Sequence, residues 1–109
     1  MIDIEEFNKL ELRIGTIIEA SINEKARNPA YVLRIDFGNS IGIKKSSAQI
    51  TALYNPGDLV GKQVVCCINL PPIHIGSITS EVRILGTKSK QGVVLIQPME
   101  NVDNGDKVF

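Results

Sequence analysis

Few residues in this sequence could do chemistry, and their types favour binding over catalysis. The candidates are polar, cationic and apolar side chains in three short stretches of the middle of the chain: Lys44, Lys45, Ser47, Gln49, Asn69, Pro71, Ile73, His74, Ile75, Ser80 and Arg83. The cationic and polar ones neutralise anions and form hydrogen bonds. We find no cluster of histidine, cysteine and carboxylate residues, no paired carboxylates at converging strands and no glycine-rich phosphate loop. We therefore expect a binding protein and not an enzyme, with no metal and no cofactor.

The paired serines after the two lysines have two interpretations. Ser46 or Ser47 could be imagined as a nucleophile, but Ser46 fits a helix N-cap better. Gln49 lies three residues on and completes a capping box. Apolar residues at helical spacing follow, and Asn55-Pro56-Gly57 would end the segment. We therefore expect a two-turn helix directly after Ser46.

A double proline leads into the second candidate stretch. Pro71 and Pro72 end strand pairing and stiffen the approach to a loop tip over residues 73–76. Its isoleucines, Ile73 and Ile75, either fold back onto the domain or form a binding patch, and both alternatives stay open. His74, the single histidine, is expected to be solvated or packed and not a catalytic base.

Strands must position these residues. Alternating apolar residues predict strands over 10–22, 31–37 and 78–84, with Gly15 as a bend point. Continuous apolar runs predict buried strands over 64–68 and 93–96. We also expect a short strand at 42–45 and a final edge strand at 107–109. A short amphipathic helix begins the chain over 2–10, capped by Asp3. We predict an all-β chain, a five-stranded β-barrel of the OB-fold type with one mid-chain helix, in a single domain over 1–109.

The composition says more about the cellular compartment of the protein than about its function. Twelve cations balance twelve anions, so no global basic field indicates nucleic acid. Residues 41–90 carry six cations and two anions, which is either a random fluctuation or a positive middle region. The adjacent cysteines, Cys66 and Cys67, should point to opposite faces of one strand as small hydrophobic residues. Unpaired thiols fit a reducing cytoplasm, and the acidic start predicts neither a signal peptide nor membrane insertion.

Several blocks of sequence resemble a known family. The stretch 7–17, with its Leu-Arg-Ile-Gly block, is similar to the first strand of the tRNA-binding OB-domain family. That family includes dimeric tRNA-binding proteins and domains of methionyl- and phenylalanyl-tRNA synthetases. Residues 42–51, 69–72 and 80–82 look more specifically like the CsaA-type secretion chaperones. The resemblance covers about residues 5–109 and implies a cytoplasmic homodimer.

The sequence also departs from the tRNA-binding pattern. As the resemblance has it, members that bind tRNA carry glycine where this chain has Ala48, and a Gly-Met pair where it has Glu81-Val82. Both changes weaken the case for RNA. We therefore predict an export-related chaperone that binds unfolded or precursor polypeptides as a homodimer, with the secretion motor as a possible partner. The alternative is a tRNA-binding protein whose cations, including Lys88 and Lys90, contact phosphates.

Overall fold

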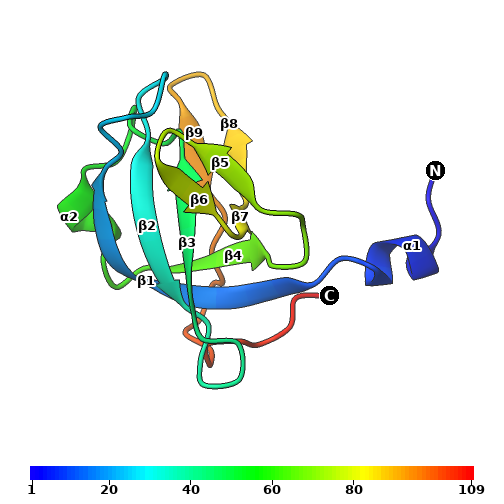
Figure 1. Cartoon of the computed structure of the whole chain (residues 1–109). Coiled ribbons are helices and arrows are strands. Elements are labelled where there is room, and N and C mark those ends of the chain that lie inside the picture. The colour runs from blue at the N-terminus through cyan, green and yellow to red at the C-terminus, as the bar shows by residue number, and fades with distance from the viewer.

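The computed structural model describes residues 1–109 and shows a nearly closed antiparallel barrel with few helical residues (Figure 1). The main sheet has the strand order β3-β2-β1-β4-β7, and two hairpins, β5–β6 and β8–β9, complete the wall. The elements are α1 (Ile4–Asn8), β1 (Leu12–Ile22), β2 (Tyr31–Asp36), β3 (Ile43–Ala48), α2 (Pro56–Leu59), β4 (Gln63–Cys67), β5 (Ile73–Ile75), β6 (Ile78–Ser80), β7 (Arg83–Ile84), β8 (Gly86–Lys88) and β9 (Val93–Leu95). The predicted OB-fold class is confirmed.

The long strand β1 organises the sheet because it pairs along both of its edges. Its first half pairs with β4, its second half with β2, and the register with β2 shifts between Ile17 and Glu19. The irregularity therefore lies beyond Gly15, the expected bend point. Gly15 is instead needed for space, since a Cβ there would lie 2.6 Å from Cγ2 of Ile35. Glycine leaves room here for the side chains of Ile35 and Phe37, which come from the neighbouring strand β2 and the residue after it.

The interior of the barrel is filled by one apolar cluster. Its most deeply buried members come from β1, β2 with the residue after it, α2 and β4: Ile17, Leu33, Ile35, Phe37, Leu59, Val64 and Cys66. A second, smaller cluster of Leu12, Ile14, Val65 and Cys67 lies on the outer face of β1 and β4. The two cysteines thus point to opposite faces, as predicted. Burial raises the pKa of the Cys66 thiol to about 12, and the neighbouring Cys67 adds to the shift.

The mid-chain helix is displaced from its predicted position. Ser46 is buried inside β3, which continues to Ala48, so the proposed capping box does not form. The helix α2 begins at Pro56, one of the residues expected to end it. Proline suits the first turn of a helix because its missing N–H would have no partner there. The apolar spacing of Ile50, Leu53 and Tyr54 instead marks a turn between β3 and α2.

Residues of both terminal segments contact the outer cluster of β1 and β4. Asp3 caps α1 as predicted, since its carboxylate accepts the Glu6 N–H at 3.0 Å, and α1 projects away from the barrel (Figure 1). Phe7 and Val108 pack against the outer cluster, and the Val108 N–H donates to the Leu12 carbonyl at 2.9 Å. The C-terminal edge predicted at 107–109 therefore runs along β1. Neither helix has the length or apolar character needed to cross a membrane.

The region predicted as a loop tip is a β-hairpin. Ile73–Ile75 pairs with Ile78–Ser80 across a turn that contains Gly76, and the single strand expected over 78–84 divides into β6 and β7. Gly76 has φ +66°, and a Cβ there would lie 2.7 Å from the backbone of Lys25. The hairpin tip therefore packs on the loop that joins β1 to β2.

Candidate functional site

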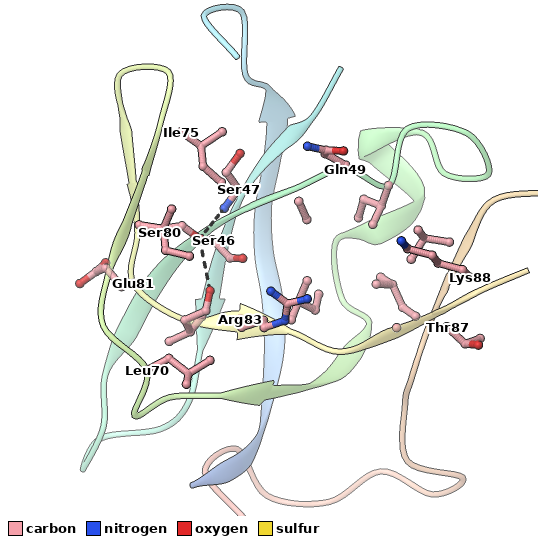
Figure 2. A pocket seen from close by; sticks show the side chains of 18 of the residues that line it. Ser46, Ser47, Gln49, Leu70, Ile75, Ser80, Glu81, Arg83, Thr87 and Lys88 are labelled. Carbon is pink, nitrogen blue, oxygen red and sulfur yellow. Dashed lines mark hydrogen bonds between the residues drawn. The ribbon is translucent and has the colours of Figure 1, made fainter. Parts of the chain in front are cut away.

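A cavity of about 380 Å³ opens between β3 and the segment that runs from the β5–β6 hairpin to β9 (Figure 2). Its lining comes from four parts of the chain: Ser46–Ile50, the Leu70–Ile75 region, Ser80–Ile84, and the β8–β9 hairpin with Gly86, Thr87, Lys88, Val93 and Leu95. Its apolar floor continues into the core, because Ile50 and Val82 line the cavity and belong to the inner cluster.

Side chains close one end of the cavity. The Ser80 hydroxyl accepts the Ser47 N–H at 3.1 Å and donates to the Val82 carbonyl at 3.3 Å, as Figure 2 shows. Next to it, the Glu81 carboxylate accepts the Lys45 N–H at 3.0 Å, and the Glu81 N–H donates to the Lys45 carbonyl at 2.8 Å. These contacts tie the hairpin to β3 without a regular strand ladder.

Asn23, in the loop after β1, also holds the hairpin in place. Only 6% of this residue is exposed, and its side-chain amide donates to the Ser47 hydroxyl and to the Ile75 carbonyl, both at 3.1 Å. One side chain, directly after the end of β1, thereby joins the C-terminal end of β3 to the first strand of the hairpin. The position of the hairpin wall depends on this contact, because a buried amide is costly to leave unpaired.

Two cations line the mouth of the cavity. Arg83 and Lys88 are exposed, and neither takes part in the two ion pairs of the structure, which are Arg13–Glu11 and Arg34–Glu19. Figure 2 shows Glu81 on the hairpin side of the cavity and Lys88 on the opposite side. The geometry therefore combines an apolar floor with unpaired positive charge at one rim, which suits an apolar ligand that carries an anionic group.

The structure brings together seven of the eleven predicted site residues. Those that line the cavity are Ser47, Gln49, Pro71, Ile73, Ile75, Ser80 and Arg83. The two isoleucines share one face of β5, and both line the cavity. Ile73 is 56% exposed, so the arrangement is compatible with the second of the two alternatives, in which the isoleucines form a binding patch.

The other four predicted residues do not line the cavity. Lys44 and Lys45 belong to the first half of β3, before the lining part begins. His74 alternates with the two isoleucines, and its Nδ1 lies 3.1 Å from the Thr79 hydroxyl. Asn69 has a structural contact, since it accepts the Glu11 N–H at 2.9 Å and donates to the Lys9 carbonyl at 2.7 Å.

Sequence reasoning missed the contribution of the β8–β9 hairpin. Thr87, Lys88, Val93 and Leu95 line the cavity, although only Lys88 was considered, as a phosphate contact. The alternation of Val93 and Leu95 gave a signal that both side chains share one face. What the sequence did not show is that this face lies opposite β3, because that depends on barrel closure.

Comparison with known proteins gives the family. Residues 12–107 match a family model described as "Putative tRNA binding domain". The chain belongs to the tRNA-binding domain family. Two solved structures match the whole chain. The chaperone CsaA from Bacillus anthracis is 46% identical with a TM-score of 0.93 over 99% of its own length. The CsaA chaperone protein from Picrophilus torridus is 41% identical with a TM-score of 0.95 over 100% of its length. The chain is thus a CsaA-type member of the tRNA-binding domain family.

Larger proteins contain the same domain. The methionine–tRNA ligase of Protochlamydia amoebophila is 36% identical over 110 residues, which include 99% of this chain. The chain spans only 15% of the length of that ligase. The family model describes a binding domain, and its match covers most of this chain.

Proposed function

We propose that this tRNA-binding-domain protein is an export-related chaperone that binds unfolded or precursor polypeptides in the cavity between β3 and the β5–β6 hairpin. The observation that carries the proposal is the cavity itself, which joins exposed apolar side chains such as Ile73 to unpaired cations. Unfolded segments present apolar side chains that such a surface removes from water. The likeness over the full chain to two proteins described as chaperones supports the same conclusion.

We further propose that the active form is a cytoplasmic homodimer that hands its clients to the secretion motor. Support for the dimer comes from the N-terminal segment, where Ile2 is 69% exposed and Ile4, the first residue of α1, is 68% exposed. A two-fold homodimer is the commonest way to cover such a surface. Two cavities per dimer would bind one extended client at two points, which raises its apparent affinity. Sedimentation equilibrium should give twice the chain mass at micromolar concentration, and a monomer would contradict the proposal.

The chaperone proposal is tested by removing the apolar wall of the cavity. Changing Ile73 and Ile75 together to serine should abolish the suppression of aggregation of a chemically unfolded client. The melting temperature should change little, because Ile73 is 56% exposed and the hairpin contacts of Asn23 are retained. The matched control is Ile43→Ser, an isoleucine that is 46% exposed and outside the cavity. If both variants lose protection equally, or if the double variant still protects the client, the proposed site is wrong.

Structured RNA is the second candidate, and the specific observation in its favour is the pair of cations at the mouth of the cavity. If these bind phosphates, Arg83→Glu with Lys88→Glu should weaken tRNA binding more than Lys44→Glu with Lys45→Glu. The second pair makes the same change of charge outside the cavity. Binding should also weaken steeply with added salt. The absence of tRNA binding at low salt would remove this candidate.

A further inference from the structure

A second cavity, of about 250 Å³, lies between α2, the start of β4 and the end of β9. Among its lining residues, Leu95 alone also lines the first cavity, between β3 and the β5–β6 hairpin. The proposed function therefore does not use the second cavity. Sites for drug-sized ligands measure about 300–1,000 Å³, so this cavity suits a smaller molecule.

The floor of the second cavity is apolar. Leu59 of α2 and Val64 of β4 are each 1% exposed and belong to the inner cluster, and Leu95 of β9 packs against that cluster. An aliphatic group that lies on this floor leaves water for an apolar surface, which is favourable. The floor therefore favours a ligand with an aliphatic part.

One cation stands at the rim of the second cavity. Lys62 is exposed and takes part in neither of the two ion pairs of the structure. Its main chain is fixed on both sides, because its N–H donates to the Leu59 carbonyl at 3.1 Å and its carbonyl accepts the Ile17 N–H at 2.9 Å. The lysine stem thus begins at a fixed point, while its ammonium group is free to bind an anion.

A carboxylate and a phenol complete the polar lining. Asp58 forms no ion pair, and its one side-chain contact is the Asn55 amide at 3.5 Å, which is long for a hydrogen bond. The Tyr54 hydroxyl accepts the Leu95 N–H at 3.0 Å, and its own proton donates to no acceptor in the structure. The cavity therefore offers two donors for an anionic group and one acceptor for a cationic group.

We infer that the second cavity binds a free aliphatic α-amino acid. Its carboxylate meets Lys62 and the Tyr54 hydroxyl, its ammonium group meets Asp58, and its side chain lies on the apolar floor. The opposite charges of Asp58 and Lys62 do not pair with each other, so a molecule that carries both charges can bridge them. A residue inside a polypeptide has neither charge on its main chain. The inference therefore goes beyond the proposed function in both its cavity and its class of ligand.

The test uses the ¹⁵N-labelled full chain and four small probes. L-leucine carries all three features, 4-methylpentanoate lacks the ammonium group, 3-methylbutylamine lacks the carboxylate, and glycine lacks the side chain. NMR titration measures the about millimolar affinity that molecules of this size reach. L-leucine should shift the amide signals of Lys62, Val64 and Leu95, and it should bind about fivefold more tightly than each of the other probes.

Two variants assign the charges one at a time. Lys62→Gln should weaken binding of L-leucine and 4-methylpentanoate about fivefold and leave 3-methylbutylamine unchanged. Asp58→Asn should weaken binding of L-leucine and 3-methylbutylamine and leave 4-methylpentanoate unchanged. Both residues are exposed, so the melting temperature should change little in either variant. The matched control is Lys90→Gln, at an exposed lysine outside both cavities, which should bind L-leucine like the unmodified protein.

Three results would overturn the inference. The first is the absence of L-leucine-dependent shifts around the second cavity. The second is binding of any other probe as tightly as L-leucine, which would mean that one of the three features is not recognised. The third is an equal loss of affinity in Lys90→Gln and Lys62→Gln. No probe is a polypeptide or an RNA, so none of these results bears on the proposed function.

Discussion

Two regions of the molecule are held by different kinds of contact. One is the frame, which consists of β1, β2 and β3, and the other is the β5–β6 hairpin. In the frame, main-chain pairs run almost without interruption over a core whose central residues, such as Leu33 and Ile35, are 0% exposed. The hairpin is tied to the frame through the side chains of Ser80, Glu81 and Asn23 and through a single main-chain hydrogen bond, from the Glu81 N–H to the Lys45 carbonyl. The frame therefore withstands most surface substitutions, whereas single polar substitutions can loosen the wall of the binding cavity.

The largest effect should come from the frame. Leu33→Ala should lower the free energy of unfolding by about 3 kcal/mol, because it removes a fully buried side chain and leaves a cavity. Denaturant unfolding measures this value. The control is Leu53→Ala, at a leucine that is 45% exposed and should cost less than about 1 kcal/mol. Comparable losses in the two variants would mean that the core is not packed as described.

Alkaline pH should also weaken the core of the barrel, through Cys66 of β4. Burial holds its pKa at about 12 in the folded protein, above about 8.5 in the unfolded chain. The unfolded chain then releases its proton first, so stability is complete below about pH 8.5 and falls as the pH rises toward 12. The free energy of unfolding should therefore fall more steeply above pH 9 in the unmodified protein than in Cys66→Ala. Equal slopes would contradict the assignment.

A smaller loss is expected where the hairpin meets the frame. Asn23→Ala should cost about 1–2 kcal/mol, since it removes two hydrogen bonds and leaves polar groups of Ser47 and Ile75 without that partner. Amide hydrogen exchange should also become faster in β5 and β6 than in β2. Asn101→Ala, at an exposed asparagine, is the control. Uniform acceleration over the whole barrel would show that the hairpin is not a separate unit.

The smallest effect is expected at Glu81. Glu81→Ala should cost about 1 kcal/mol, because the Lys45 N–H loses its carboxylate acceptor. Glu81→Gln keeps an oxygen at the same position and should recover most of this loss. Denaturant unfolding of both variants measures the difference. If alanine and glutamine cost the same, the contact with β3 is not the source of the stability.

Much of the fold could be predicted because alternation is a local property. Tyr31, Leu33 and Ile35 specify one buried face of β2 by sequence alone. The helix was misplaced because the apolar spacing after Ser46 fits a helix as well as it fits a strand followed by a turn. Barrel closure decided between them, and it buries Ser46 in β3. Closure is a long-range property that short sequence windows do not contain.

The candidate site was predictable to a similar degree and for the same reason. Ile73, Ile75 and Arg83 were found because their types and neighbours were informative. Lys44 and Lys45 were included because they are cations close to Ser47 in sequence, but the lining part of β3 begins only after them. Asn69 was included with its double proline, and its amide instead bonds to the main chain of Lys9 and Glu11, in the segment between α1 and β1.

The most direct test of the central claim is to map where an unfolded polypeptide contacts the chain. The ¹⁵N-labelled protein is titrated with a permanently unfolded client segment, and amide chemical-shift changes are followed by NMR. The account predicts that the largest changes cluster on both sides of the cavity, at Ser47, Gln49, Ile84, Lys88 and Val93. Changes confined to α1 and the outer cluster, with none along the cavity, would contradict it.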